Sequence, residues 1–476
     1  MKKIKHILAV AAMAAACNAS AQNLNSAYFM DGFAYGHLMN PAKDYDRNSY
    51  FSVPFLPVPG NFNTGIKGNI GLQNIFLKNP NGNGLVTYLH PEISYAKAME
   101  GFSNNNKLLS DIRYDLLSVG FHGMGGYNTI TMGIRSQIGL NLPYELFSLT
   151  KRLENRDYEL EDLGVNAKAW AEIGLGHSHQ INEAWRIGAK AKVLLGVGYA
   201  KLNVDELDLD LENPNRWVAE GNATMEVGVN GFSWGETETK EYKTKPGTYQ
   251  QIDFDNADVD KFGLNGGGFA VDLGAEWDLG KQGILEGMKV SAALLDLGFI
   301  KWKSVSTAYN KGDEFVFDGF EDIKVEDGPG TSFEDQIDEL EDKLSDLISL
   351  QDGGTASKSN GIGATLNVGV EYALPVYDKL SFGLLSTTRF QGEYTWNEER
   401  ISANVSPVKW FEVGANLGVG TFGASFGWVV NLHPRGFNLF LGMDRMLGKI
   451  SKQGIPLRSN ADFNIGINFP LGKSKI

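Results

Sequence analysis

The sequence predicts an all-β fold, an antiparallel transmembrane β-barrel of about 14 strands, from three observations. Apolar residues alternate with polar or small ones in runs of about 8–11 residues, the length of a strand that crosses a bilayer at a tilt. Beyond the first 21 residues, no stretch has the roughly 18 consecutive apolar residues of a membrane-spanning helix. Glycine accounts for 57 of the 476 residues, about 12% against a usual ~7%, and such small side chains leave room inside an enclosed barrel.

The first 21 residues have the three parts of a secretory signal peptide. Three lysines lie within the first five positions, an apolar run spans 7–16, and Ala19-Ser20-Ala21 forms an A-x-A cleavage pattern. We therefore expect cleavage between Ala21 and Gln22, export, and a final location in the cell outer membrane.

Cys17 is the single cysteine of the chain and lies inside this signal. A chain cut after Ala21 therefore has no disulfide, no thiolate chemistry and no cysteine-ligated zinc. A lipoprotein signal, cut before Cys17, is the less favoured alternative, because three alanines precede the cysteine and no Leu or Val stands at the usual place.

The stretch 418–427, GVGTFGASFG, contains G-x-G-x-x-G and G-x-S-x-G, the patterns of dinucleotide-binding proteins and of serine hydrolases. Both patterns require a strand, a sharp turn and then a helix. Here the residues alternate with period two before and after the stretch, from Phe411 to Leu432, which is typical of strands. We predict a β-hairpin with a two-residue turn at Gly420-Thr421, since glycine suits a type II′ turn, and we do not expect an enzyme.

The same alternation indicates 14 candidate strands, of which the second is the weakest because Pro91 interrupts it. They begin near Ile66, Tyr88, Leu117, Thr129, Ala167, Trp185, Leu264, Met288, Leu366, Leu380, Trp410, Phe422, Phe437 and Ala461. A soluble β-sandwich alternates too, but here charge does not interrupt the apolar face, while Gly, Asn, Ser, Asp, Glu and Lys occupy the other face. This composition favours a membrane barrel over a secreted soluble β-protein.

Two acidic insertions account for the formal net charge of −14. Residues 203–260 hold 14 acidic against 4 basic residues, and residues 304–357 hold 15 against 3. We expect both to be surface loops of the barrel, and their charge disfavours nucleic-acid binding. The second contains a capping box at Ser332 and Asp335. An amphipathic helix follows, with its stripe at Phe333, Ile337, Leu340, Leu344 and Leu347. A shorter helix is predicted at 143–149.

Charged residues on the polar faces of the predicted strands are candidates for lining the lumen. They are Asp272, Glu276, Glu371, Glu412, Arg186, Lys190 and Arg389. A network of salt bridges that fills the interior is a more ordinary role than ligand contact, and we favour it. We expect no catalytic residue, no metal site and no cofactor.

Residues 28–42, YFMDGFAYGHLMNPA, with the plug motif Asn40-Pro41-Ala42, come soon after the expected cleavage site. Together with Leu142-Pro143, the strand GGGFAVDLGAEW at 266–277 and the ending FNIGINFPLG, they resemble a Bacteroidota outer-membrane family of undefined function. That family is similar to PorP/SprF-type proteins and to long-chain fatty-acid transporter (FadL-like) barrels. The resemblance implies a 14-stranded barrel at 61–476, with a plug-like segment at 22–60 inside or under it. The chain departs from the pattern at its end, LGKSKI, which lacks a terminal aromatic residue.

Two functions fit this interpretation. The first is an outer-membrane transporter or binder of small hydrophobic or amphipathic compounds. The alternative is a non-conducting accessory of the envelope or of a secretion system, or a surface interaction protein. The partners expected are outer-membrane lipid, a small hydrophobic ligand and an envelope protein, and nucleic acid is not expected.

Overall fold

The computed structural model describes most of the chain. Outside the description are 1–23, 46–48, 55–59, 83, 153, 155, 214–215, 242–245, 253–256, 281–284, 312–314, 318–349, 447–459 and 472–476. The expected signal peptide, the bond between Ala21 and Gln22, Cys17, and the helix predicted from Ser332 lie outside the described residues. Among the described residues, no helix has both the length and the apolar character needed to span a membrane.

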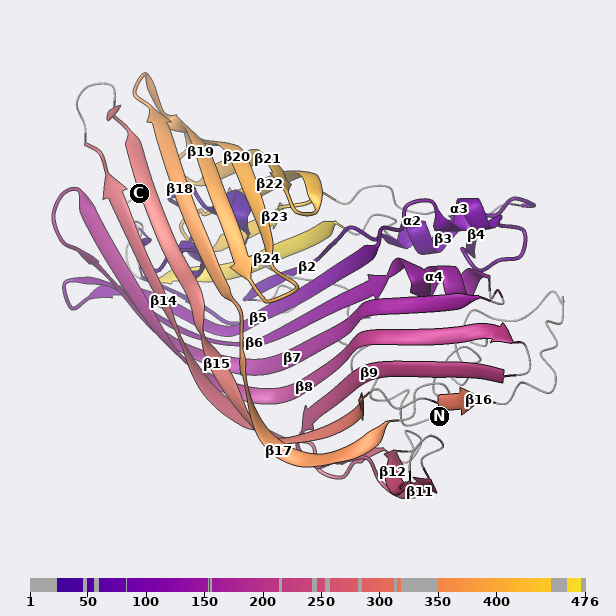
Figure 1. Cartoon of the computed structure of the whole chain (residues 1–476). Coiled ribbons are helices and arrows are strands. Elements are labelled where there is room, and N and C mark those ends of the chain that lie inside the picture. Colours follow the sequence, from indigo (N-terminus) through magenta and orange to yellow (C-terminus); the bar gives the residue numbers. More distant parts are fainter. Residues whose placement is uncertain are drawn as a thin grey trace.

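Fourteen antiparallel strands pair in sequence order and close into a ring, which confirms the predicted fold (Figure 1). The last strand closes the ring on the first, through the register Asn61↔Gly466. In order the strands are β2 (Asn61–Gly68), β5 (Asn105–Gly123), β6 (Gly126–Pro143), β7 (Asp157–Gln180), β8 (Trp185–Asn213), β14 (Gly266–Asp278), β15 (Met288–Lys311), β18 (Ala364–Leu374), β19 (Tyr377–Phe390), β20 (Trp396–Val408), β21 (Phe411–Gly420), β22 (Gly423–Leu432), β23 (Asn438–Met443) and β24 (Ala461–Leu471). The short β1 (Ser49–Ser52) also lies between β24 and β5. It pairs with residues 118–120 of β5, just beyond the part of β5 that pairs with β2.

The two faces of the ring have the polarity of a membrane-spanning barrel. On β7, Ile173 and Leu175 are 41% and 60% exposed on the outer face, whereas Glu172 is 1% exposed in the interior. The same inversion runs around the ring, for example at Leu417, which is 64% exposed beside the buried Asn416. An apolar outer wall around a buried polar interior is the reverse of a soluble protein, and it is stable only in contact with lipid.

The two ends of the ring differ. Connections at one end are the shorter ones, at 124–125, 181–184, 279–287, 375–376, 409–410 and 433–437, and the last strand also finishes there; we call it the short-turn end. The opposite end, the long-loop end, carries the long connections with α2 (Leu72–Ile75), α3 (Tyr95–Met99) and α4 (Tyr144–Lys151). The small hairpin of β3 (Phe76–Lys78) and β4 (Leu85–Thr87) is also there. Long connections on one side only are typical of outer-membrane barrels.

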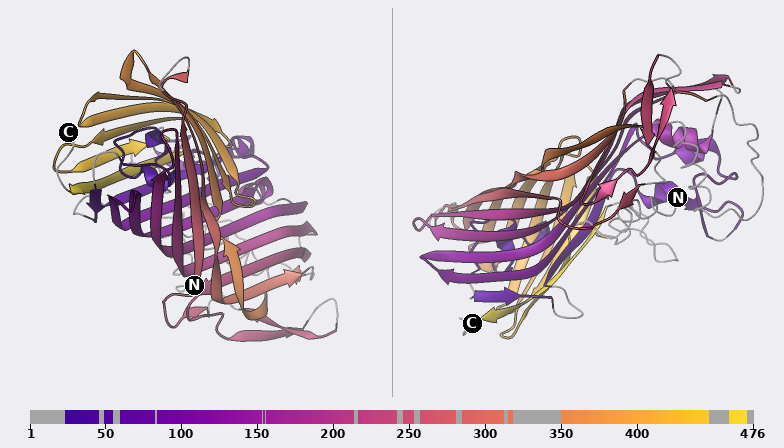
Figure 2. Two further views of the ribbon diagram at one scale, coloured as in Figure 1. Left: turned by 90° about the vertical axis from the view of Figure 1, so that its left-hand side faces the viewer. Right: turned by 90° about the horizontal axis from the view of Figure 1, so that it is seen from below.

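At the long-loop end, β5 to β8 and β15 continue beyond the ring and form a curved sheet with further strands (Figures 1 and 2). In this extension β9 (Arg216–Val229) replaces β14 beside β8, and β17 (Gln351–Gly361) replaces β18 beside β15. Further strands are β10 (Phe232–Ser233), β11 (Thr237–Glu241), β12 (Thr248–Ile252), β13 (Asp258–Val259) and β16 (Phe315–Phe317).

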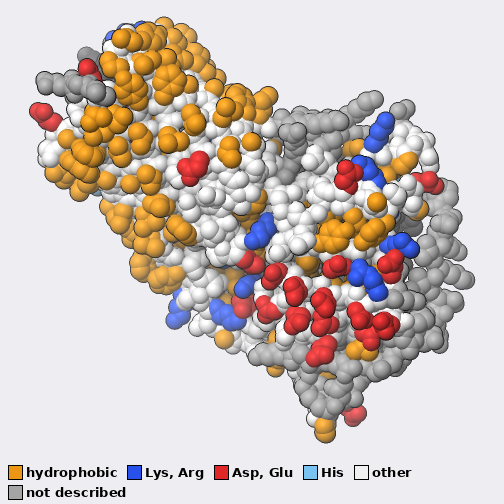
Figure 3. All heavy atoms as spheres, turned by 45° about the horizontal axis from the view of Figure 1, so that its top comes forward, with side chains coloured by type: hydrophobic (Ala, Val, Ile, Leu, Met, Phe, Trp, Pro, Cys, Tyr) orange, Lys and Arg blue, Asp and Glu red, His pale blue; other side chains and the backbone are white. Residues whose placement is uncertain are grey.

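The extension has the polarity of a water-exposed sheet. Its apolar side chains are buried in a core that includes Tyr158, Leu160, Leu207 and Leu209, whereas the residues alternating with them, such as Glu159, are exposed and acidic. Figure 3 shows the two regions, with hydrophobic side chains gathered over one part of the surface and carboxylates over another. The membrane boundary therefore crosses the long strands themselves.

The described parts of the two acidic insertions correct a prediction. Residues 203–260 are mostly strands, from the end of β8 through β9 to β13, and 304–311 continue β15. They extend the sheet instead of forming loops, because their leucines keep the two-residue period and pack into one core. The helix predicted at 143–149 is confirmed as α4, Tyr144–Lys151.

The strand count was right, but one strand in it was wrong. The run at Tyr88 is no barrel strand: Tyr88 follows the small strand β4 and is buried among side chains of the 69–104 connection. The fourteenth barrel strand is instead β20, which is not among the predicted strands. On β20 charges occupy both faces near the long-loop end, with Glu399 outward and Glu398 inward, and this hides the alternation.

The predicted hairpin at 411–432 exists, but its turn lies one residue later. Gly420 pairs with Gly423, so Thr421 and Phe422 form the turn and the positive φ of 86° belongs to Gly423. Leu417 opposes Phe426 on the outer face. Neither glycine pattern is followed by a helix, and both glycine runs belong to paired strands.

Candidate functional site

The lumen of the barrel is occupied by residues 24–45, which we call the inner segment (Figure 2). It is a chain of turns with two short 3₁₀ helices, η1 (Asn25–Ala27) and η2 (Gly36–Leu38). Its aromatic residues Tyr28, Phe29, Phe33 and Tyr35 are buried against wall residues such as Phe440. The segment lies within the 22–60 range that the resemblance implies for a plug.

The motif Asn40-Pro41-Ala42 is seated on two facing glycines of the wall. Gly188 on β8 pairs with Gly274 on β14, and a Cβ atom on either would collide with the motif. The Asn40 side chain accepts a hydrogen bond from the Ala42 backbone N–H (2.9 Å) and donates one to the Ala275 carbonyl (3.3 Å). Glycine is thus required at this level of the wall for close approach of the inner segment.

Further inward-facing glycines have the same role. An added Cβ atom would lie 3.0 Å or less from a side chain of the inner segment at four further wall positions. These are Gly369 against Tyr28, Gly383 against Phe29, Gly414 against Met30 and Gly442 against Leu24. The high glycine content of the strands is therefore explained in part by the shape of the segment they enclose.

Two buried carboxylates anchor the inner segment to the wall. Asp444 accepts hydrogen bonds from the backbone N–H groups of Asn25 (2.8 Å) and Ser26 (2.6 Å), and from the Ser26 hydroxyl (2.5 Å). Glu412 accepts from the backbone N–H of Gly32 at 3.1 Å. Three of these four bonds come from backbone N–H groups of the segment, so the carboxylates hold mainly its path, and the Ser26 hydroxyl adds one bond between side chains.

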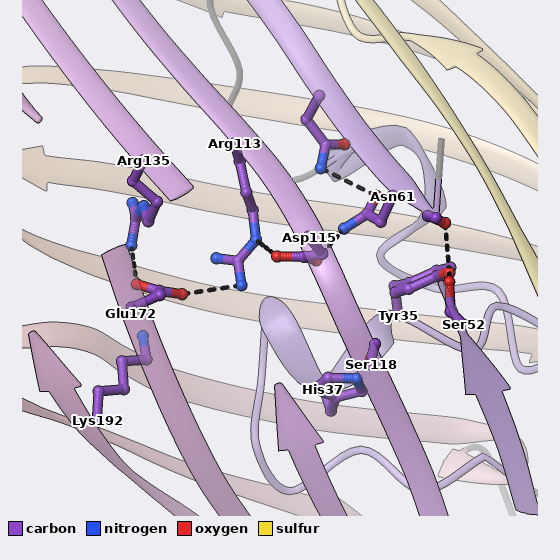
Figure 4. Close-up of polar contacts among 12 residues, drawn as sticks. Tyr35, His37, Ser52, Asn61, Arg113, Asp115, Ser118, Arg135, Glu172 and Lys192 are labelled. Atoms are coloured by element: carbon purple, nitrogen blue, oxygen red, sulfur yellow. Dashed lines mark hydrogen bonds and ion pairs between the residues drawn. The ribbon is translucent and has the colours of Figure 1, made fainter. Parts of the chain in front are cut away.

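Near the short-turn end the inner segment is held by hydroxyl groups. Tyr35 donates to the carbonyl oxygen of Gly60 at 2.6 Å and contacts Ser52 Oγ at 2.8 Å (Figure 4). His37 Nε2 lies 2.8 Å from the Tyr50 hydroxyl, which is 2.9 Å from Ser118 Oγ. Burial, followed by nearby cations, holds the pKa of His37 well below its ordinary value, so the imidazole is neutral.

A layer of paired charges, which we call the charged layer, crosses the lumen on the long-loop side of the inner segment. Arg113 lies between Asp115 (3.0 Å) and Glu172 (3.0 Å), and Arg135 contacts the other oxygen of Glu172 at 3.4 Å (Figure 4). Because every one of these groups is buried, each charge requires its partner.

Asp296 is the centre of this layer. Arg135 (2.8 Å), Lys192 (2.6 Å) and Arg389 (3.7 Å) converge on its carboxylate. A bulge in β15 turns it inward: the register shifts opposite Val271 and Leu273, and Asp296 has a φ of 60°. Bulges of this kind often re-aim a side chain at functional positions.

The seven predicted lumen residues occupy four different places. Asp272 and Arg389 belong to the charged layer, at 2.6 Å from Lys192 and 3.7 Å from Asp296. Glu412 anchors the inner segment. Arg186, Glu276 and Glu371 line a cavity at the short-turn end. Lys190 is 1% exposed, and its ammonium has no hydrogen-bond partner among the described residues.

The cavity at the short-turn end has a volume of about 340 Å³. The rings of Phe29, Phe33 and Tyr127 contribute to its lining. So do ion pairs between inner segment and wall, Lys43 with Glu276 at 3.6 Å and Asp44 with Arg186 at 2.8 Å. A second cavity, in the charged layer, measures only about 30 Å³, roughly the volume share of one water molecule. These two cavities share no lining residue, so they are separate spaces among the described residues.

Asp296 and Asp444 are not among the predicted lumen residues. Asp296 follows the apolar run at 292–295, and only the bulge brings it inward. Asp444 lies just beyond the end of β23. A strict two-residue period cannot find residues whose direction is set by a bulge or by the end of a strand.

The matching family model covers residues 41–444, most of the chain. The chain belongs to the family described as "Family of unknown function (DUF5723)". A search of curated proteins finds no match for this member of the family.

Among solved structures, this DUF5723 protein is similar to the toluene transporter TbuX of Ralstonia pickettii, with 10% identity, coverage of 92% and 94% of the two chains and a TM-score of 0.41. It is also similar to a FadL homologue of Pseudomonas aeruginosa, with 10% identity, 91% and 92% coverage and a TM-score of 0.37. For the toluene transporter TodX of Pseudomonas putida the values are 9%, 95%, 95% and 0.34. Similarity at this level assigns no activity.

Proposed function

We propose that this protein is an outer-membrane barrel that binds or passes small hydrophobic or amphipathic compounds, with the inner segment as a displaceable plug. The observation that carries the proposal is the filling of the lumen. A separate stretch of chain fills the lumen, and it is held to the wall by hydrogen bonds and packing. The segment can therefore leave without breaking any hydrogen-bonded pairing between barrel strands.

The ligand class follows from the cavity at the short-turn end. Aromatic rings and paired charges share its lining, which suits a molecule with one apolar and one polar part. Because short turns face the periplasm in outer-membrane barrels, this cavity is the periplasmic side of the proposed path.

Liposome swelling tests the conduit. The purified barrel is inserted into liposomes, and swelling in small neutral solutes is compared with that of Gly188→Ala, in which the seat of the plug is filled. Binding is tested separately with the fluorescent hydrophobe N-phenyl-1-naphthylamine. Swelling by the variant above the wild type, together with saturable binding of the dye, supports the proposal. A barrel that stays sealed in both forms and binds no dye contradicts it.

The second candidate is a non-conducting accessory of the envelope or of a secretion system, or a surface interaction protein, as for PorP/SprF-type proteins. One observation favours it: carboxylates face each other across the exposed extension, with Asp208 opposite both Glu159 and Glu220. Like charges directly opposite are destabilising unless something compensates them. Co-purification of a basic envelope protein with a sealed barrel supports this alternative.

A further inference from the structure

The connection between β19 and β20, residues 391–395, crosses the mouth of the lumen; we call it the mouth hairpin. Counted around the ring from β2, β19 and β20 are strands nine and ten, while β6 and β7 are strands three and four. The hairpin contacts β6 and β7, six positions away in a ring of 14. It therefore spans the long-loop end from one wall to the nearly opposite wall.

Tyr394 makes the crossing contact. Its side chain is 1% exposed although the neighbours Glu393 and Thr395 are exposed. The Tyr394 ring lies over Gly139 of β6, so close that a Cβ atom added to Gly139 would be 2.8 Å from a ring carbon. The Tyr394 hydroxyl lies beside Gly164 of β7, and a Cβ atom added there would be 3.0 Å from the hydroxyl oxygen. Leu109, Trp396 and Phe422 pack around it. We call this place the glycine slot.

Among the described residues, two polar contacts join the hairpin to the far wall. Lys107 donates to the carbonyl oxygen of Glu393 at 2.6 Å, and the side chains of Gln391 and Gln137 meet at 3.5 Å. The turn itself closes through short-range bonds, Tyr394 N–H to the Gln391 carbonyl at 3.2 Å and Thr395 N–H to that of Gly392 at 3.1 Å. The hairpin can therefore swing outward as a unit once the ring leaves the slot.

The slot lies directly above the charged layer. Successive inward positions on β6 are Arg135, Gln137 and Gly139, and on the other wall Arg389 is followed by Gln391. If the mouth hairpin swings out, Tyr394 and Gln391 leave together, and the charged layer with its cavity of about 30 Å³ would be the next level below Gln137.

We propose that the glycine slot is the outer binding site of the lumen for a flat six-membered ring of a small ligand, with Tyr394 as its displaceable internal occupant. This inference rests on the proposed function and extends it by naming where and how a ligand first engages. The slot is flat because two glycines form its floor, and it already holds a ring in full burial. A ligand ring that takes this place releases the mouth hairpin.

The test uses a cysteine reporter, since a chain cut after Ala21 has no other cysteine. Thr387 lines the cavity in the charged layer and is 2% exposed. Thr387→Cys is labelled in detergent with a bulky, membrane-impermeant maleimide, alone and combined with Tyr394→Gly, Tyr394→Phe or Gly139→Ala. The last variant leaves Tyr394 in the chain and fills the floor of its slot. Ser291→Cys, beneath the inner segment, is the matched control reporter.

Tyr394→Gly and Gly139→Ala are expected to speed labelling at position 387, and Tyr394→Phe to leave it slow. Because minor open states of this kind are populated at about 0.1–10%, full opening raises the rate about 10- to 1000-fold. Labelling at position 291 stays unchanged. With Tyr394 intact, 4-methylphenol speeds labelling at 387, and the ring-free 1-hexanol does not.

Unchanged labelling in both glycine-slot variants overturns the closure by the hairpin. Failure of 4-methylphenol to speed labelling, or an equal effect of 1-hexanol, overturns the ring site. Both results are distinct from failure of the proposed function, because the inner segment blocks passage whether or not the mouth hairpin is open.

Discussion

Gly188→Ala is the sharpest test of the inner segment as a separate, movable part. The new methyl group would lie 2.5 Å from the backbone nitrogen of Ala42 and would overlap the Pro41 carbonyl. The wall cannot yield, because Gly188 is paired on both sides, with Ser178 on β7 and Gly274 on β14. The inner segment must therefore move.

The magnitude follows from the kind of clash. Overpacking a well-packed interior costs about 1–3 kcal/mol, and the upper part of that range applies because the atoms met are backbone atoms that cannot rotate away. At about 1.4 kcal/mol per factor of ten, a cost near 3 kcal/mol raises the population of the displaced segment about 100-fold.

Hydrogen exchange followed by mass spectrometry measures this population. Peptides from residues 24–45 of the variant are expected to exchange about 100-fold faster, while peptides from the hairpin at 411–432 exchange as in the wild type. Gly267→Ala on β14 is the matched control, since its Cβ would meet only the Leu194 carbonyl at 3.7 Å. Wild-type protection of residues 24–45 in Gly188→Ala, or loss of protection in the barrel strands instead, refutes the reasoning.

Three further predictions concern the anchors, the charged layer and the two surfaces. Asp444→Ala removes three hydrogen bonds to the inner segment and, at about 1–3 kcal/mol for each buried group left unpaired, accelerates exchange at 24–30; unchanged exchange there contradicts the anchoring role. Asp296→Asn removes a carboxylate shared by three buried cations; Lys192 keeps Asp272 and Arg135 keeps Glu172, but Arg389 loses its ion-pair partner among the described residues. Since breaking a buried pair costs about 3–5 kcal/mol, the temperature of the heat-induced shift in gel mobility should fall, and an unchanged temperature argues against a stabilising layer. Leu175→Arg, on the lipid face, should cost about 2–4 kcal/mol in denaturant unfolding from vesicles. Glu159→Arg on the same strand should cost less than about 0.5 kcal/mol; equal costs place the membrane boundary elsewhere.

The barrel itself could be predicted because lipid leaves a local trace in sequence. A strand with hydrocarbon on one side and a polar interior on the other must alternate, and residues 411–432 do so on both arms of the hairpin. Where the environment changes along one strand, the same period no longer distinguishes lipid from water. The leucines of 207–211 alternate as lipid-facing residues do, yet they are buried in the core of the extension.

The sequence by itself determined the alternation of most barrel strands and the inward direction of charges such as Asp272 and Glu412, because each depends only on a residue and its neighbours two places away. Only the tertiary structure decided what the interior holds: which glycines receive the inner segment, how a bulge turns Asp296 to the centre, and that Tyr394 reaches the opposite wall. Those contacts join residues separated by up to several hundred positions. They depend on the closure of the ring, which no local pattern records.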